Sequence, residues 1–447
     1  MTAAHRYPDS DVFYRDLTRT FPRIERGEGV YLFDAEGKRY LDACGGAYVA
    51  NIGHGVHEVA QAIGEQAARV SYVNGTAFTS GPVEEMATAL ASRMPAGDAW
   101  KAYFLCSGSE AVEAALKLAR QYWVVRGKAT KDTIIARTPG YHGNTLLALS
   151  ASARGHYKKL YQPWLADVVM IPAPYPYRCA CDDEGPCDVC DGDVLEKAIL
   201  ERGADRVAAF IAEPVGGSST GASVPRPGYH ARVRAICDAH DVLYVADEVL
   251  TGAGRTGRWL AMEHQGVVPD IVTMGKGISG GYAPLSAVLA PRRITDVIAQ
   301  GGGGLKHAQT FSHFALGCAA GVAAVRYIEQ HGLVERAAAM GKVLHAELAA
   351  LLDLPAVGDV RGLGMLAGVE LVADRATKRP FPRAQRVAER LVETAQSLGL
   401  VLWSNIGHAD GESGDLVTVA PAFVITEAQI RELVATLRDA IVRVTKA

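Results

Sequence analysis

The feature that constrains the fold most is a set of five short, largely apolar runs in the middle of the chain. They cover Thr133–Arg137, Val168–Pro172, Val207–Val215, Val242–Val249 and Asp270–Lys276, and helical patterns such as Arg226–His240 lie between them. A strand that is apolar on both sides is buried on both sides, as in a parallel sheet covered by helices. The sequence therefore predicts an α/β fold with a mostly parallel sheet.

Size and charge narrow the class of protein further. The chain has 447 residues, of which 49% are hydrophobic and 21% charged, and its net charge is −3. This balance favours neither nucleic acid nor an anionic membrane surface as a partner. No apolar run approaches the roughly 20 residues that span a bilayer. The first 21 residues lack the apolar stretch of a secretory signal, so we expect a cytoplasmic protein.

A second structural unit is predicted toward the C-terminus. A long helix is expected from about Gly317 to His331, followed by strands near Val357–Leu371 and Leu416–Val424 and a terminal helix near Glu427–Val444. We predict a large domain over residues 63–334. A small α+β domain is expected to combine residues 1–62 with residues 335–447.

Lys276 is the sharpest candidate for chemistry. It ends an apolar run and is followed by Gly277, Gly280 and Gly281. A lysine at the mouth of a buried sheet is partly desolvated, which lowers the pKa of its amine and makes the amine available for imine formation. The alternative is an ordinary surface lysine after a strand.

Two acids also follow predicted strands. Asp247 lies at the end of one run, and Glu213 lies within the last residues of another. Ligands of open α/β sheets bind at the carboxyl ends of the strands, where an acid can pair with a pyridine nitrogen. The alternative for Asp247 is a helix cap or a turn acid.

Two further segments offer ligand contacts. Ser107-Gly108-Ser109 follows the strand-like run Trp100–Cys106 and opens a helix, so its backbone N–H groups can bind a phosphate. Ser107 with Glu110 also fits a capping box, which is compatible with phosphate binding. Tyr141, followed by His142, can stack on a flat cofactor or can simply pack in the core.

One apparent nucleotide motif is rejected. Gly362-Leu363-Gly364 resembles the start of a dinucleotide-binding loop. It lacks the third glycine at the required spacing and lies far from the first strand–helix turn.

Taken together, these segments resemble the class III aminotransferases, the ω or ornithine-type group of fold-type I enzymes that use pyridoxal 5′-phosphate (PLP). The resemblance runs through SGSEAVEAALKLAR, YHG, AEPV, VADEVLTGAGRTG, MGKGISGGYAPL and RGLGMLAGVEL, in this order. It covers nearly the whole chain. It implies an enzyme that moves an amino group from an amine or amino acid to a keto acid in two half-reactions.

The resemblance also implies a role for each candidate residue. Lys276 would hold the cofactor as a Schiff base and transfer the substrate proton, and Asp247 would pair with the ring nitrogen. Glu213 would lie near the cofactor and the substrate carboxylate. The resemblance further implies a homodimer with shared active sites and no catalytic metal. The remaining cofactor contacts would come from Ser107, Gly108, Ser109, Tyr141, His142 and Val249, and from Thr310 of the neighbouring subunit.

The chain departs from the family near its C-terminus. Many members place a carboxylate-binding arginine where this sequence has Thr418, in the stretch DLVTVAPAF. A small keto acid such as pyruvate is therefore favoured over 2-oxoglutarate. Racemase, aminomutase and lyase chemistry on the same scaffold, and a non-catalytic PLP-binding module, are the alternatives.

Four of the eight cysteines cluster within twelve residues, at Cys179, Cys181, Cys187 and Cys190. Four thiolates can close a tetrahedral zinc site, although CxC with CxxC is less regular than two CxxC pairs. A structural zinc, free thiols in a surface loop, and a disulfide are the three possibilities. The segment from Pro172 to Asp193 resembles an insertion beside the predicted site.

Overall fold

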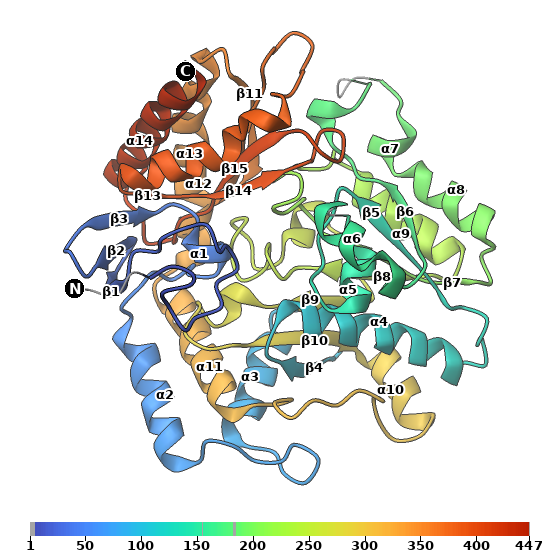
Figure 1. Ribbon diagram of the computed structural model, residues 1–447. Helices are drawn as coiled ribbons and strands as arrows, with labels where there is room; N and C mark the ends of the chain where they lie inside the picture. The colour runs from blue at the N-terminus through green and yellow to red at the C-terminus, as the bar shows by residue number, and fades with distance from the viewer. Residues whose placement is uncertain (1–4, 154, 182–184, 447) are drawn as a thin grey trace.

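A seven-stranded sheet forms the centre of the protein. The computed structural model describes residues 5–153, 155–181 and 185–446 (Figure 1). All neighbouring strands are parallel except β10, which runs antiparallel to both β4 and β9. The mostly parallel α/β sheet predicted from the sequence is confirmed. The strands lie in the order β4 (Trp100–Leu105), β10 (Ser286–Pro291), β9 (Ile271–Met274), β8 (Leu243–Asp247), β7 (Val207–Ala212), β5 (Thr133–Thr138) and β6 (Val168–Pro172).

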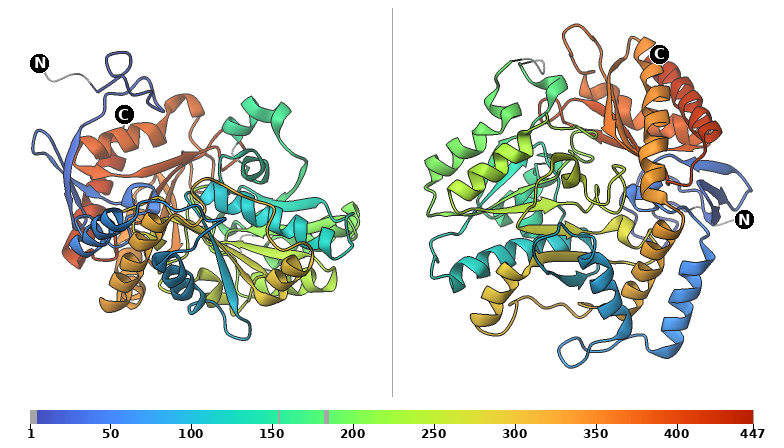
Figure 2. Two further views of the ribbon diagram at one scale, coloured as in Figure 1. Left: turned by 90° about the horizontal axis from the view of Figure 1, so that it is seen from below. Right: turned by 180° about the vertical axis from the view of Figure 1, so that it is seen from behind.

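Helices cover both faces of this sheet (Figure 2). On one face, α4 packs against β7, β8, β9 and β10, with α5 and α10 beside it. On the other face, α8 and α9 pack against β6 and β8. The helices up to α11 are α1 (Gly45–Tyr48), α2 (His57–Arg69), α3 (Gly81–Ala91), α4 (Gly108–Val125), α5 (Leu146–Ala151), α6 (Gly155–Tyr161), α7 (Asp188–Asp191), α8 (Asp193–Arg202), α9 (Tyr229–Ala239), α10 (Arg292–Gln300) and α11 (Ala315–Gln330).

Two smaller sheets lie beside the central one, and one of them joins both ends of the chain. Its strands are β1 (Ile24–Glu28), β2 (Tyr31–Asp34), β3 (Arg39–Asp42) and β13 (Leu400–Val401), and β13 pairs parallel with β3. In Figure 1 the blue N-terminal strands accordingly lie against the orange-red C-terminal part. The other sheet contains β11 (Val357–Leu363), β12 (Leu366–Leu371), β15 (Asp415–Val419) and β14 (Trp403–Ile406), with helices α12 (Leu333–Ala349), α13 (Val387–Ser397) and α14 (Glu427–Thr445). The domain boundaries near residues 62 and 334 stay predictions.

The strands end earlier than their apolar runs suggest. β7 stops at Ala212, before Glu213-Pro214, because proline has no N–H for the ladder. β9 stops at Met274, since Lys276 has a left-handed backbone (φ 46°) that cannot continue a strand. These early ends leave the predicted site residues in loops at the carboxyl edge of the sheet.

None of the helices in the described part of the chain combines the length and the apolar character that crossing a bilayer requires.

The contact of α4 with the sheet offers a test of the fold. Trp123 is 1% exposed, and its Nε1 donates a hydrogen bond to the Ala208 carbonyl oxygen (2.8 Å). We expect Trp123→Ala to lower the free energy of unfolding by roughly 3–5 kcal/mol, because it leaves a large cavity and an unpaired carbonyl. The adjacent Val124 is 47% exposed, so Val124→Ala should change the free energy of unfolding by less than about 0.5 kcal/mol. Urea denaturation of both variants measures this, and equal losses would contradict the packing described.

Candidate active site

A cavity of about 220 Å³ opens at the carboxyl ends of the parallel strands. Most of the predicted site residues line it, although they come from loops that are widely separated in the sequence. This convergence follows from the sheet, because parallel strands end at one edge. The predicted residues that line the cavity are Gly108, Ser109, Tyr141, His142, Glu213, Asp247, Val249 and Lys276.

A buried carboxylate–imidazole pair forms the floor of the cavity. Asp247 Oδ2 lies 2.7 Å from Nδ1 of His142, and both residues are at most 5% exposed. Asp247 Oδ1 accepts hydrogen bonds from the Thr273 hydroxyl and from the Val249 backbone N–H (3.1 Å each). The His142 backbone N–H in turn donates to Ser152 Oγ (2.8 Å). These contacts fix the orientation of the Asp247 carboxylate.

The two adjacent acids at this strand end point to opposite sides of the sheet. Asp247 lines the cavity, whereas Glu248 is completely buried and does not line it. Glu248 accepts hydrogen bonds from the Thr251 hydroxyl (2.5 Å) and from the Met262 backbone N–H (2.9 Å). Burial raises the pKa of Glu248 to about 7. Only Asp247 can therefore meet a ligand in the cavity.

The N-terminus of α4 forms one wall of the cavity. Ser107 caps the helix: its Oγ accepts from the Glu110 N–H (3.3 Å), and Glu110 Oε2 accepts from the Ser107 N–H (2.8 Å). Ser107 itself does not line the cavity. Gly108 begins the helix, and a Cβ at this position would lie 2.6 Å from Val249 Cγ1. Because Gly108 has no side chain, a phosphate can come close to this helix end. The first backbone N–H groups of the helix and the helix dipole would stabilise its negative charge.

The loop after β5 closes over this helix end. The Asn144 backbone N–H donates to Ser109 Oγ (3.0 Å). Gly143 has a φ of 138°, and a Cβ there would lie 2.5 Å from the same oxygen. Only glycine fits at this approach, so the loop sequence and the helix end are matched to each other.

Glu213 is held at the back of the cavity. Its two carboxylate oxygens accept from the backbone N–H groups of Tyr141 (3.3 Å) and Gly217 (2.9 Å). The residue is 6% exposed, and burial raises the pKa of Glu213. Its backbone carbonyl also accepts from the Arg137 guanidinium. The carboxylate thereby connects the loops that follow β5 and β7.

Lys276 reaches the cavity from a strained turn. It begins the 3₁₀ turn Lys276–Ile278 and is half-buried, with the left-handed φ described above. A Cβ on the next residue, Gly277, would lie 2.7 Å from Asn51 Nδ2, so the turn is tightly enclosed. A non-glycine residue in this conformation is an outlier of the kind that concentrates at functional sites. The surface-lysine alternative does not fit this position.

Sequence reasoning missed several cavity residues. Tyr48, Trp403, Arg15 and Tyr157 also line the cavity. Tyr48 Oη lies 2.5 Å from Thr418 Oγ1, and Thr418 donates to the Trp403 carbonyl oxygen (3.2 Å), so the tyrosine hydroxyl is the donor in this pair. Thr418 is 1% exposed and lies behind Tyr48. A positive φ at Tyr48 (65°) is the local signature, but the sequence does not reveal it.

Two predicted positions lie outside the cavity of this chain. Thr310 does not line it; its carbonyl oxygen accepts from the Tyr72 hydroxyl (2.9 Å). Tyr72, Phe78 and Phe311 are all large exposed side chains. The four clustered cysteines lie between β6 and α8, also away from the cavity lining.

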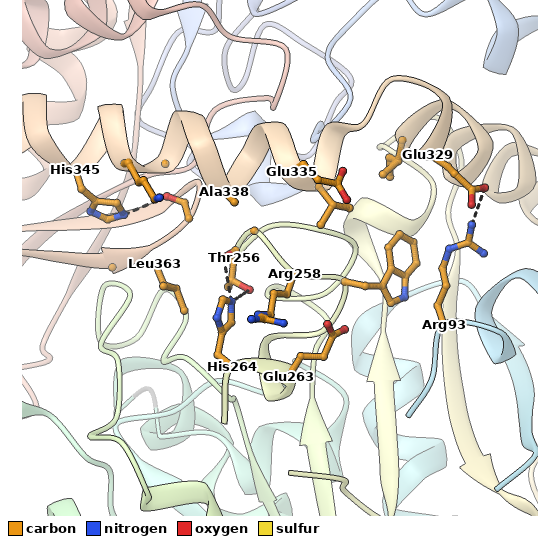
Figure 3. Close-up of a pocket in the computed structure, with 18 of the residues that line it drawn as sticks. Arg93, Thr256, Arg258, Glu263, His264, Glu329, Glu335, Ala338, His345 and Leu363 are labelled. Carbon is orange, nitrogen blue, oxygen red and sulfur yellow. Dashed lines mark hydrogen bonds and ion pairs between the residues drawn. The ribbon is translucent and has the colours of Figure 1, made fainter. Parts of the chain in front are cut away.

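A larger cavity of about 810 Å³ lies elsewhere, beside α12 (Figure 3). It contains none of the predicted site residues, and its charged groups partly pair with each other, as Arg93 does with Glu329 (2.9 Å). Gly364 lines it, and a Cβ there would lie 2.3 Å from the Thr256 carbonyl carbon. The Gly362–Gly364 turn therefore serves close packing, in agreement with its rejection as a nucleotide loop.

Comparisons with known proteins identify aminotransferases as relatives over nearly the full length of the chain. The family model Aminotransferase class-III matches residues 13–441. The chain is 38% identical to an uncharacterised aminotransferase, YodT, of Bacillus subtilis, covering 96% of this chain and 97% of that protein. It is 36% identical to a taurine–pyruvate aminotransferase of Bilophila wadsworthia, covering 92% of this chain and 90% of that protein. A solved structure of an (S)-enantioselective omega-transaminase from Thermomicrobium roseum is 34% identical, with a TM-score of 0.89, and the match covers 99% of this chain and 96% of that protein.

The burial of Glu248 predicts a pH dependence of stability. Its pKa is about 7 in the folded protein, against an ordinary value of 4.5. Below pH 4.5 Glu248 is protonated in both the folded and the unfolded protein, so its raised pKa does not affect the free energy of unfolding. As the pH rises from 4.5 to above 7, the unfolded protein releases this proton first, and the free energy of unfolding falls. Glutamine does not ionise, so Glu248→Gln lacks this loss. We therefore expect the difference in unfolding free energy between Glu248→Gln and wild type to shift in favour of the variant by roughly 3 kcal/mol from pH 4.5 to pH 8. Urea denaturation at both pH values measures the difference, and a difference independent of pH would contradict the assignment.

Proposed function

Because the chain belongs to the class III aminotransferases, we propose that it uses PLP, bound in the 220 Å³ cavity, to transfer an amino group from an amine or amino-acid donor to a keto acid. Its α/β architecture is that of fold-type I enzymes, as in the related solved transaminase. The observation that carries the proposal is the convergence of Lys276, Asp247 and the bare N-terminus of α4 on one cavity.

The cavity residues fit this cofactor. A dianionic phosphate suits the helix end at Gly108 and Ser109, which needs no metal to bind an anion. Tyr141 and Val249 offer an aromatic and a branched surface to a flat ring, and His142 and Ser107 support the cofactor contacts indirectly through Asp247 and the helix cap. The buried Asp247 carboxylate suits a protonated ring nitrogen.

PLP, when bound, supplies the electron sink that stabilises the electrons left by a broken Cα–H bond. The protein's own groups do the rest. Asp247 keeps a proton on the ring nitrogen, and the His142–Asp247 hydrogen bond keeps the carboxylate aimed at it. The amine of Lys276 would accept the proton from the substrate Cα and deliver it to the C4′ carbon of the cofactor. Glu213 stays fixed by its two backbone hydrogen bonds and shapes the wall beside the reacting atoms.

We infer a small keto acid such as pyruvate as the acceptor. Thr418 is buried and bonded to Tyr48, so it offers no charge to a carboxylate. Among the residues that the structure describes, Arg15 is the only arginine in the cavity lining, and it lies on the exposed N-terminal segment against Tyr157. One carboxylate can pair with it, but a second carboxylate would enter the cavity unpaired, which is costly.

We also infer a homodimer with shared active sites. Thr310 lies outside this chain's cavity, next to the exposed side chains of Tyr72 and Phe311, whose rings contact each other (centroids 5.7 Å apart). Apolar groups gathered on one surface favour a partner. Thr310 is proposed to reach the cofactor phosphate in the neighbouring subunit.

The experiment that tests the function is an absorption spectrum of the purified protein with a panel of amines and amino acids, followed by assay of the keto product. We expect a visible cofactor band that disappears with one class of donor and returns when pyruvate is added. A racemase or aminomutase would form no keto product. A protein with no visible band even after addition of PLP would refute the proposal.

Two variants separate the proposed roles. We expect Lys276→Ala to lower turnover by roughly 10⁴-fold or more, because it removes the proton acceptor. Asp247→Asn should keep the cofactor bound and lower kcat by roughly 10²-fold or more, because the ring nitrogen loses its proton. The neighbouring Glu248→Gln, which faces away from the cavity, is the matched control and should keep turnover near wild type. Steady-state turnover retained in Lys276→Ala would refute its role.

The acceptor proposal has its own test. We expect kcat/KM to be at least roughly tenfold higher with pyruvate than with 2-oxoglutarate, since the second carboxylate has no cation. Arg15→Ala should raise KM for pyruvate roughly tenfold with little change in kcat, whereas Arg19→Ala is the control, because Arg19 bonds to Gln396 outside the cavity. Steady-state kinetics measures both. A preference for 2-oxoglutarate would contradict the proposal.

A further inference from the structure

The four cysteines between β6 and α8 bring their sulfur atoms together in the folded protein. Their Sγ atoms all lie within 4.8 Å of one another. Cys181 is 3.2 Å from Cys179 and 3.6 Å from Cys190, and Cys179 is 3.4 Å from Cys187. All four are free thiols in this structure, and Cys190 is completely buried.

These separations match the edges of a small tetrahedron. Four thiolates around zinc at about 2.3 Å lie roughly 3.8 Å from one another. The three shortest sulfur–sulfur distances, 3.2, 3.4 and 3.6 Å, are slightly below that edge length, and the other distances are at most 4.8 Å. All of them are too long for bonded sulfurs. The side chains of two short segments, one with Cys179 and Cys181 and one with Cys187 and Cys190, converge on one point. Packing of thiols in a surface loop does not by itself require such convergence.

We propose that Cys179, Cys181, Cys187 and Cys190 bind one zinc ion in a closed, structural site. Four protein ligands leave no open coordination position, so the ion does not bind substrate. The site is independent of the proposed transamination, because none of its ligands lines the 220 Å³ cavity. Zinc is favoured over harder cations because all four ligands are soft sulfur atoms.

The surroundings of the cluster provide the supporting contacts that such sites use. Arg226 is 15% exposed in its side chain; Nη2 donates to Cys181 Sγ (3.1 Å) and Nη1 donates to Asp191 Oδ1 (3.1 Å). Asp191 Oδ2 in turn accepts from the Cys187 backbone N–H (2.8 Å). Four thiolates with Zn²⁺ carry a net charge of −2, and the Arg226 guanidinium offsets part of it.

The position of the cluster indicates what the ion stabilises. The chain that enters it is bonded to the C-terminal sheet: Tyr175 Oη donates to Glu370 Oε2 (2.5 Å), and Arg178 Nε donates to Glu370 Oε1 (2.6 Å). Ser223 Oγ also donates to the Pro174 carbonyl oxygen (3.1 Å), and Ser223 belongs to the same loop as the cavity residue Ser218. The metal therefore braces a segment that packs behind one wall of the cavity.

The test measures metal directly in the purified full-length protein. Protein produced in zinc-supplemented medium and purified without chelator is analysed by inductively coupled plasma mass spectrometry. We expect about one zinc per chain in wild type, less than one tenth of that in Cys187→Ser/Cys190→Ser, and about one in the control Cys318→Ala. Cys318 is a buried cysteine on α11, outside the cluster. Metal-free wild type, iron in place of zinc, or intact masses showing disulfides in the cluster would each overturn the proposal.

A second measurement covers the case in which the double variant does not fold. Wild-type protein produced with cobalt(II) in place of zinc is expected to show the intense red-region absorption of tetrahedral cobalt and a near-ultraviolet thiolate-to-cobalt band. These bands report four sulfur ligands in the folded protein and do not depend on activity. A wild-type protein that takes up no cobalt, or that gives only weak octahedral bands, would overturn the site. Where Cys187→Ser/Cys190→Ser does fold, treatment with a chelator is expected to lower the melting temperature of the wild type and not that of this variant.

Discussion

The chemistry proposed for this protein depends on one geometric constraint: parallel strands deliver their loops to one edge of a sheet. Gly108 follows β4, Tyr141 follows β5, Glu213 follows β7, Asp247 ends β8 and Lys276 follows β9. Each loop contributes little alone, but hydrogen bonds within the central sheet fix the distances between them. A helix end, an acid and a lysine can therefore act on one small ligand although long stretches of sequence separate them.

The loops are also fitted to one another by steric exclusion. Val249 occupies the space that a side chain at Gly108 would need, and Ser109 occupies the space beside Gly143. The α4 terminus, which forms one wall of the cavity, is thus positioned by residues of the loops after β5 and β8 as well as by its own cap. Lys276 adds a strained turn that the enclosed Gly277 makes possible. A rigid arrangement of this kind positions groups before a ligand binds, which is how enzymes limit the reorganisation cost of catalysis.

A network of buried charges joins the segment after β6 to the C-terminal sheet. Glu370 on β12 accepts hydrogen bonds from Tyr175 and Arg178 and pairs with Arg361 (2.8 Å). The nearby arginine charges hold the pKa of the Glu370 carboxyl well below its usual range against the opposing effect of burial. Removing one partner from such a network leaves a buried charge unpaired. Cys179 directly follows Arg178 of this network, so a metal in the cysteine cluster would hold the same segment against the C-terminal sheet.

The sequence by itself determined the parallel sheet and the main chemical groups, because an apolar run followed by a lysine, an acid or a glycine-rich turn is a local signal. The family resemblance pointed to Asp247, but the local pattern did not show why its neighbour Glu248 is excluded. Asp247, the last residue of β8, lines the cavity, whereas the next residue, Glu248, is buried in the core. The sequence indicated that Ser107 caps a helix, as the structure shows, but it did not reveal that Thr418 lies behind Tyr48. Tyr48, Trp403 and Arg15 come from segments far from the central strands, and only the pairing of distant strands, such as β3 with β13, places such segments beside the sheet. Local patterns identify the groups that can react, whereas long-range packing decides which of them meet.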